Sequence, residues 1–229
     1  MSHFSVAVFH RPDQKIDDLL APYDENMEVA PYVRYTRQEA IDQARKNPRN
    51  KDKSDDECWK LMAEDETTDA EGNILSTYNP KSKWDWWEVG GRWTGILKMG
   101  GKPVSSGRFG DLTLSHDDKE AYAYHLRFWD VVVDHQPAKP GEDFTSFYRE
   151  SYYREYYGDR ETYARYQTQF STYAVVTPDG VWHGKGEMGW WGCSSESADQ
   201  AKDWEEHYKE RFLDTADPDW VLTIVDCHI

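Results

Sequence analysis

The chain has 229 residues, and its 43 acidic and 27 basic side chains give a formal net charge of −16. Phosphate groups are bound by local excesses of Lys and Arg, so this charge disfavours direct binding to nucleic acid or to an anionic membrane. A partner protein with a basic surface fits the charge better. Aromatic residues make up 15% of the chain and provide the apolar area for a folded core.

No apolar run approaches the roughly 20 residues of a membrane span. The first residues, MSHFSVAVFH, lack the basic start and the small-residue cleavage site of a signal peptide. The three cysteines are far apart and include no CxxC pair, so reduced thiols are expected. These features predict a cytoplasmic protein.

In the first part of the chain, alternating polar and apolar residues predict a strand at about residues 3–10. The following helix should end near Ala21, because Pro22 disfavours helical geometry in the residue before it. After an extended piece, Thr36 and Glu39 have capping-box spacing and predict the start of a helix over TRQEAIDQARKN.

Residues 47–56 are charged and show no periodicity, so they are interpreted as a flexible loop. A helix over DDECWKLMAED, a turn at TDAEGN and a strand over RWTGILKM are expected next.

The second half is interpreted as alternating strands and helices. The expected elements are a strand over LRFWDVVVDH, two helices between 143 and 170 broken at Gly158, a hairpin at 171–184, a helix at 194–214 and a terminal strand, WVLTIVDCHI. The mixture predicts a single α+β domain over residues 1–229, with a mostly antiparallel sheet packed with several helices.

The segment YNPKSKWDWWEVGGRW, residues 78–93, concentrates four tryptophans beside a glycine pair. It either builds a corner of the core or forms one wall of a ligand pocket, in which indoles stack a planar ring and an arginine binds a phosphate or carboxylate. The candidate ligand-binding residues are Trp84, Asp85, Trp86, Arg92, Trp93 and Trp190. No cofactor is expected, because GGR lacks the spacing and the lysine of a phosphate-binding loop.

The sequence also contains a candidate set of metal ligands. Asp226 and His228 fall on one face of the terminal strand, and His183 and Glu187 lie four apart in a glycine-rich segment. If the two segments were neighbours, these four side chains would suit a divalent metal. A catalytic residue cannot be assigned from the sequence.

Acidic residues recur at helical spacing late in the chain, including Asp199, Asp203 and Glu206. Such a stripe is either a solvated helix face or a docking surface for a basic groove. Tyr153 and Tyr157 lie in a Tyr- and Arg-rich helical region of the kind favoured at protein interfaces. These five residues are the candidate partner-binding set.

The segments SHFSVAVF, LLAPYDEN, NPKSKWDWWEVGGRWTG, VWHGKGEMGWWG and LTIVDCHI together resemble an uncharacterised family of phage and mobile-element accessory proteins. The resemblance covers the whole chain but brings no known activity or catalytic residue. It implies a protein that acts in the host cytoplasm against a host defence.

The leading hypothesis is a stoichiometric inhibitor of a host nucleic-acid-binding defence protein, of the anti-CRISPR or anti-restriction type, acting through an acidic, Tyr-rich surface. The alternative is a nucleotide-binding protein or metal-dependent hydrolase that sequesters or degrades a signalling nucleotide in a Trp-lined pocket.

Overall fold

The computed structural model describes residues 2–114 and 119–229, apart from the side chain of Trp190. Contacts divide the chain into two compact units, one formed by Met1–Leu20 with Trp84–Ile229 and the other by Ala21–Lys83. We expected one domain over residues 1–229; the contacts instead separate the segment 21–83 as a unit of its own.

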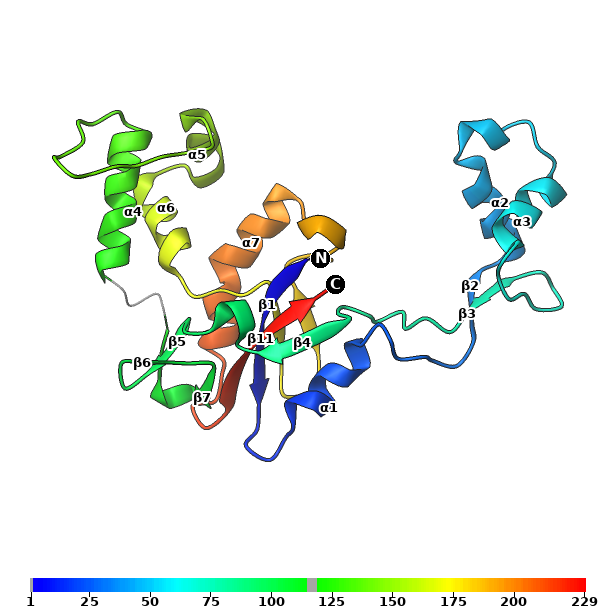
Figure 1. Cartoon of the computed structure of the whole chain (residues 1–229), viewed down its shortest axis with the longest axis horizontal. Coiled ribbons are helices and arrows are strands. Elements are labelled where there is room, and N and C mark those ends of the chain that lie inside the picture. The colour runs from blue at the N-terminus through cyan, green and yellow to red at the C-terminus, as the bar shows by residue number, and fades with distance from the viewer. Residues whose placement is uncertain (1, 115–118) are drawn as a thin grey trace. The chain divides into compact units, whose positions relative to one another are not determined.

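The larger unit is built on a sheet with the strand order β10-β9-β1-β11-β4, and β7 pairs with β11 beside β4 (Figure 1). Its strands are β1 (His3–His10), β4 (Trp86–Val89), β7 (Ser106–Arg108), β9 (Ala174–Val176), β10 (Trp182–Gly184) and β11 (Val221–His228). Only the β1–β9 pair is parallel among these described strands. The predicted α+β class and mostly antiparallel sheet are confirmed.

The centre of this sheet is the antiparallel pair of β1 and β11, which runs from His3 opposite His228 to His10 opposite Val221. The interior of both strands is buried, as the near-continuous apolar runs FSVAVF and VLTIV require. Figure 1 shows the two ends of the chain side by side at one end of this pair.

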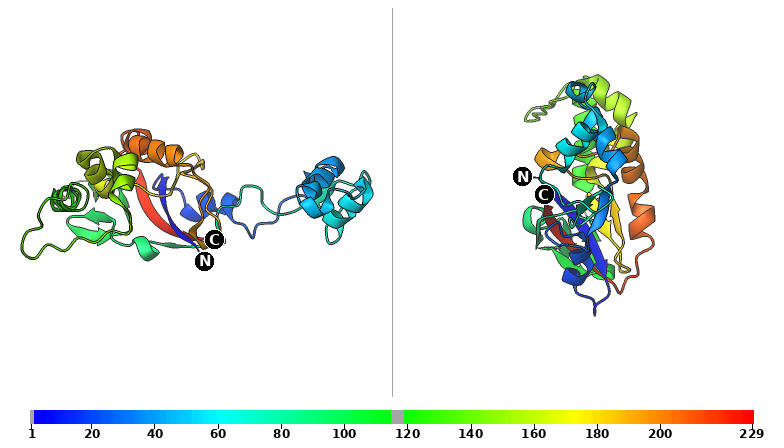
Figure 2. Two further views of the ribbon diagram at one scale, coloured as in Figure 1. Left: turned by 90° about the horizontal axis from the view of Figure 1, so that it is seen from above. Right: turned by 90° about the vertical axis from the view of Figure 1, so that its right-hand side faces the viewer.

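One face of the sheet is covered by α7 (Ala198–Tyr208) and the π-helical turn Lys209–Leu213 that continues it (Figure 2). Trp204, Tyr208 and Phe212 pack on this face against Phe9 and Ile224. A small sheet, β6-β5-β8, adds Leu97 and Leu114 to the same core; its strands are β5 (Leu97–Met99), β6 (Lys102–Val104) and β8 (Leu112–Leu114). The short helix α1 (Ile16–Leu20) follows β1.

A second core lies among α4 (Lys119–Val132), α5 (Glu150–Tyr157) and α6 (Arg160–Thr168). The strand predicted for residues 126–135 is therefore wrong, because most of this segment belongs to α4. Phe128, Trp129 and Val132 share one helical face and pack against Tyr163, so tertiary packing overrides the β-propensity of the VVV run. The predicted helix break at Gly158 is confirmed.

The smaller unit contains β2 (Tyr32–Tyr35), α2 (Arg37–Arg45), α3 (Asp55–Ala63) and β3 (Ile74–Ser76). The predicted capping box of Thr36 and Glu39 is confirmed, and Ser54 with Glu57 forms a second one at α3. The helices enclose a core around Ile41, Ala44 and Cys58. Within residues 47–56, expected to be a flexible loop, Pro48–Asn50 form a 3-10 turn.

Every helix of the described residues is too short or too polar to cross a bilayer.

An ion pair fastens the loop after α4. The Arg127 guanidinium donates from Nε at 3.0 Å and from Nη2 at 2.8 Å to the two oxygens of Glu142. These bonds, together with the Lys139 backbone N–H, lower the pKa of Glu142 to about 2. Because folding lowers the pKa of Glu142, the ionised carboxylate stabilises the folded protein. This stabilisation is full at pH values above the ordinary glutamate pKa of 4.5 and is lost as the pH falls towards 2.

We therefore expect Glu142→Gln to lower the thermal unfolding midpoint at pH 7, with the difference from the unaltered protein shrinking below about pH 4.5 and disappearing below pH 2. The measurement is the midpoint of both proteins across this range. Glu155→Gln, on the exposed face of α5, is the control and should change the midpoint little at any pH. An equal deficit of Glu142→Gln at pH 2.5 and pH 7 would contradict the assignment.

Candidate functional site

At the end of the sheet where the two chain ends lie, His3, His228 and Trp86 form a row across β1, β11 and β4. Ser2 and Ile229 exchange both backbone hydrogen bonds, so the next pair, His3 and His228, is a non-hydrogen-bonded pair with closer side chains. The two imidazole centroids are 4.9 Å apart, and the Trp86 indole lies 6.4 Å from the His228 ring.

His3 is held by the buried carboxylate of Asp226. The His3 Nδ1 lies 3.0 Å from Asp226 Oδ1, and Asp226 is 1% exposed. The second oxygen, Oδ2, accepts the backbone N–H of Arg92 at 2.9 Å. Burying a carboxylate is unfavourable unless its oxygens are hydrogen-bonded, and here both of them are.

The glycine pair explains how the backbone comes so close to this carboxylate. Gly91 has a φ of +49°, and a Cβ at this position would lie 2.5 Å from Asp226 Oδ2. Only glycine leaves room for the 3-10 turn Gly91–Trp93 to place its N–H on the carboxylate. The Arg92 side chain is exposed and makes no ion pair with the described residues.

His228 is oriented by a second carboxylate. Its Nδ1 lies 2.6 Å from Asp85 Oδ1, and the Asp85 backbone N–H donates to the His228 carbonyl at 2.9 Å. A carboxylate at Nδ1 favours the tautomer that carries its proton there and presents Nε2 as an acceptor. Within residues 2–114 and 119–229, no hydrogen bond is made by Nε2 of either histidine.

A glycine-rich loop is bonded to the residue that precedes β1. Ser2 Oγ donates to the Gly189 carbonyl at 2.8 Å and accepts the Gly192 N–H at 2.6 Å, which ties the loop to the start of the chain. Between these anchors Trp191 has a φ of +65°, unusual for a bulky residue, and its side chain is 83% exposed. The turn thus displays an indole in solvent at some cost in backbone strain.

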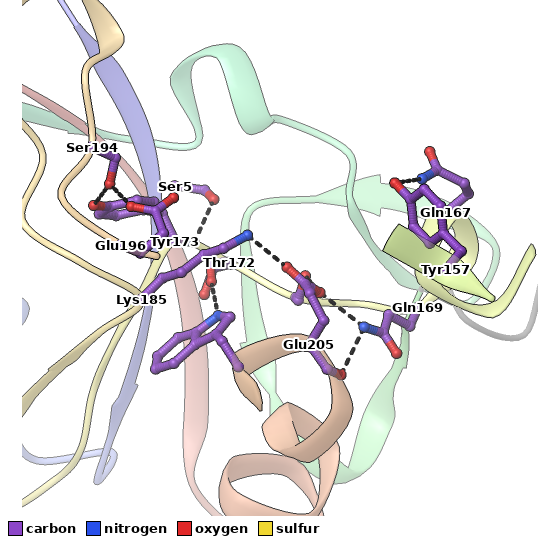
Figure 3. A network of polar contacts seen from close by, with 12 residues as sticks. Ser5, Tyr157, Gln167, Gln169, Thr172, Tyr173, Lys185, Ser194, Glu196 and Glu205 are labelled. Carbon is purple, nitrogen blue, oxygen red and sulfur yellow. Dashed lines mark hydrogen bonds and ion pairs between the residues drawn. The ribbon is translucent and has the colours of Figure 1, made fainter. Parts of the chain in front are cut away.

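Polar contacts tie this loop and β9 to α7 (Figure 3). The Tyr173 N–H donates to Ser5 Oγ at 3.2 Å, and the Tyr173 hydroxyl is hydrogen-bonded to Ser194. Glu205 of α7 pairs with Lys185 at 3.1 Å and accepts from Gln169 at 2.8 Å. The network holds both ends of the segment that carries Trp191.

Comparisons with protein-family models, with curated proteins and with solved structures found no match.

The structure brings together five of the residues singled out in the sequence: Asp85, Trp86, Arg92, Asp226 and His228. The tryptophan segment is divided between surface and core, because Trp86 is 49% exposed beside His228 whereas Trp84 is buried.

The core indoles are Trp84, which is buried, and Trp93, which packs against the α7 core. Neither indole N–H has an acceptor among the described residues. The side chain of Trp190 lies outside the described part of the structure.

The proposed metal-binding set is not assembled. His183 lies on β10 in register with Val175, where burial lowers its pKa and its ring packs on Phe212. Asp226 and His228 bind His3 and Asp85 instead. Among the described residues, no group of three or more His, Cys, Asp or Glu side chains is arranged to hold a metal ion.

His3 was not recognised from the sequence. The alternation of β1 predicts that His3 and Ser5 lie on one face of a strand. It does not identify the partner strand, β11, which lies more than two hundred residues away in the sequence. Cys227 faces the opposite side of the sheet, where burial and the neighbouring Asp226 raise the pKa of its thiol. It is therefore not a nucleophile for this site.

The predicted partner-binding residues are placed differently from the expectation. Tyr153 is 7% exposed and belongs, with the half-buried Tyr157, to the core of α4, α5 and α6. On α7, Asp203 is paired with Arg211 at 2.9 Å and Glu206 lies 3.9 Å from Lys202. Local cations thus neutralise much of the acidic stripe, which also includes Asp199.

The contact between Gly91 and Asp226 leads to a stability prediction. Gly91→Ala should destabilise the protein by about 1–3 kcal/mol more than Gly100→Ala, because it also displaces the N–H bonded to a buried carboxylate. Gly100 is a matched control, since its φ is +57° and a Cβ there meets nothing within 4 Å. Urea unfolding followed by tryptophan fluorescence measures both, and equal destabilisation would show that Asp226 does not depend on this close approach.

Proposed function

We propose that the paired Asp–His dyads, Asp226–His3 and Asp85–His228, form an acid–base catalytic site that cleaves a phosphodiester bond in a nucleotide. The observation that carries the proposal is the contact of two carboxylate-oriented imidazoles, 4.9 Å apart, whose Nε2 atoms make no hydrogen bond with described residues. Imidazole both accepts and releases a proton near neutral pH, so one ring can serve as base while the other serves as acid.

The carboxylates keep each ring in the required orientation and stabilise the positive charge when it is protonated. Asp226 is fixed more firmly, because it is almost fully buried and also binds the Arg92 N–H. The Asp85 side chain is 32% exposed. His3 and His228 are thus the proposed catalytic residues, and the two aspartates are positioning residues.

Two neighbouring side chains support a nucleotide as substrate. Trp86 is exposed beside His228, and stacking on an aromatic ring stabilises a bound base by roughly 1–3 kcal/mol. Arg92 has the planar guanidinium that suits a phosphate. The net charge of −16 disfavours a long polyanion, so a small nucleotide fits better than extended DNA or RNA.

We expect His3→Ala and His228→Ala each to lower nucleotide cleavage by roughly 10²–10⁴-fold, the usual contribution of one acid or base. The protein is incubated with mixed ribodinucleoside monophosphates and cyclic nucleotides, and product formation is monitored by chromatography with mass detection. His207→Ala, on the exposed side of α7, is the control and should retain full activity. Activity that survives loss of both site histidines would sink the proposal.

A second candidate function is favoured by an exposed aromatic patch next to α5. We propose that Phe147, Tyr148 and Tyr152 contact a host nucleic-acid-binding defence protein and block it. Phe147 is fully exposed, Tyr148 is 59% exposed, and Tyr148 stacks on Tyr152 with centroids 4.4 Å apart. Exposed aromatic clusters of this kind are typical of protein interfaces.

For this second function, the double substitution Phe147→Ser with Tyr148→Ser should abolish capture of a nucleic-acid-binding protein from host lysate. Val181→Ser removes an exposed apolar side chain from the β9–β10 hairpin and should not affect capture. The captured protein should be released by competing nucleic acid. Capture that is indifferent to both the double substitution and the competitor would argue against inhibition through this patch.

A further inference from the structure

We infer that the substrate carries a hydroxyl group beside the scissile phosphodiester, as a ribose 2′-hydroxyl does, and that this hydroxyl attacks the phosphorus. The inference rests on the proposed acid–base function of His3 and His228, and it names the class of substrate: a small nucleotide with a ribose 3′-phosphodiester.

In the described part of the chain, no serine, threonine or cysteine side chain is hydrogen-bonded to His3 or His228, as a nucleophile activated by these rings would be. Ser2 Oγ is engaged by Gly189 and Gly192, and Ser5 Oγ accepts the Tyr173 N–H. Cys227 points to the other face of the sheet and is fully buried. The attacking oxygen must therefore come from water or from the substrate.

The accelerations that two imidazoles can supply favour a nucleophile carried by the substrate. An acid and a base contribute roughly 10²–10⁴-fold each, which together amounts to about 10⁴–10⁸-fold. Attack of water on phosphate esters is among the slowest of biological reactions and requires accelerations of up to about 10²¹-fold. A neighbouring hydroxyl provides an effective concentration of roughly 10⁵–10⁸ M. Two imidazoles are thus sufficient when the substrate supplies its own nucleophile.

Activation of water by a metal ion is another route to hydrolysis of such esters. That route needs a set of ligands fixed by the protein. In residues 2–114 and 119–229, no three His, Cys, Asp or Glu side chains form such a set, and the two aspartates of the site are hydrogen-bonded to histidines.

The reaction balances without any further reactant. One imidazole Nε2 removes the proton of the 2′-hydroxyl while O2′ forms a bond to phosphorus. The bond from phosphorus to O5′ breaks, and O5′ takes the proton of the second, protonated imidazole. The products are a 2′,3′-cyclic phosphate and a free 5′-hydroxyl, and the two rings have exchanged protonation states.

The order of the row assigns the two histidines. Trp86 lies beside His228, and His3 lies on the far side of His228. A base stacked on Trp86 places its own ribose, with the attacking hydroxyl, nearest to His228. His228 is then the base, and His3 is the acid that protonates the leaving oxygen.

The deciding experiment compares ribodinucleoside monophosphates with their 2′-deoxy counterparts in the presence of EDTA. We expect cyclic phosphate from the ribo compounds and at least about 10³-fold slower cleavage of the deoxy compounds. Similar cleavage of both to linear monophosphates would overturn the inference and leave the proposed function standing. Cleavage of neither would overturn both.

The assignment of roles is tested with a ribonucleoside 3′-(4-nitrophenyl phosphate), whose leaving group needs no proton. His3→Ala should then react within about tenfold of the unaltered protein, whereas His228→Ala should remain roughly 10²–10⁴-fold slower. Rescue of His228→Ala instead, or an equal deficit in both variants, would contradict the assignment.

Discussion

The buried carboxylate of Asp226 is the group on which the arrangement of the site depends. A carboxylate without partners would be strongly destabilising at this depth, so its surroundings must supply hydrogen-bond donors. One donor is the imidazole of His3 on the neighbouring strand, and the other is the backbone N–H of Arg92. Meeting this requirement brings three distant parts of the chain together and leaves His3 with a fixed orientation.

The same constraint accounts for the glycine pair in an otherwise aromatic segment. The turn at Gly91 can approach Asp226 only because it lacks a side chain, and the turn continues directly from β4, which carries Trp86. The position of the exposed indole and the position of the buried carboxylate are thus coupled through one short stretch of backbone. Tryptophans on either side of this stretch, Trp84 and Trp93, secure it in the core.

Charge and aromatic exposure are distributed unevenly over the larger unit. The acidity of α7 is partly compensated by Lys185, Lys202 and Arg211, whereas Arg92 has no ion-pair partner in the described chain. Exposed aromatic side chains include Trp86 beside the histidine pair and a cluster next to α5. The first suits stacking of a nucleotide base, and the second suits a protein contact, so the two proposed functions use different surfaces.

Sequence pattern by itself determined the α+β class, the strands at both ends of the chain, the capping box at Thr36 and the hairpin of β9 and β10, because these depend on local periodicity and on neighbouring residues. It also marked the residues Asp226 and His228 as one face of a strand. It failed for α4, where packing reversed the local β-propensity. Only the tertiary structure decided that Asp226 and His228 contact His3 and Asp85 rather than His183 and Glu187. Strand alternation determines which face of the sheet a side chain is on, but not which residue lies opposite it. That partner is determined by the pairing of β1 with β11, which joins residues from opposite ends of the chain.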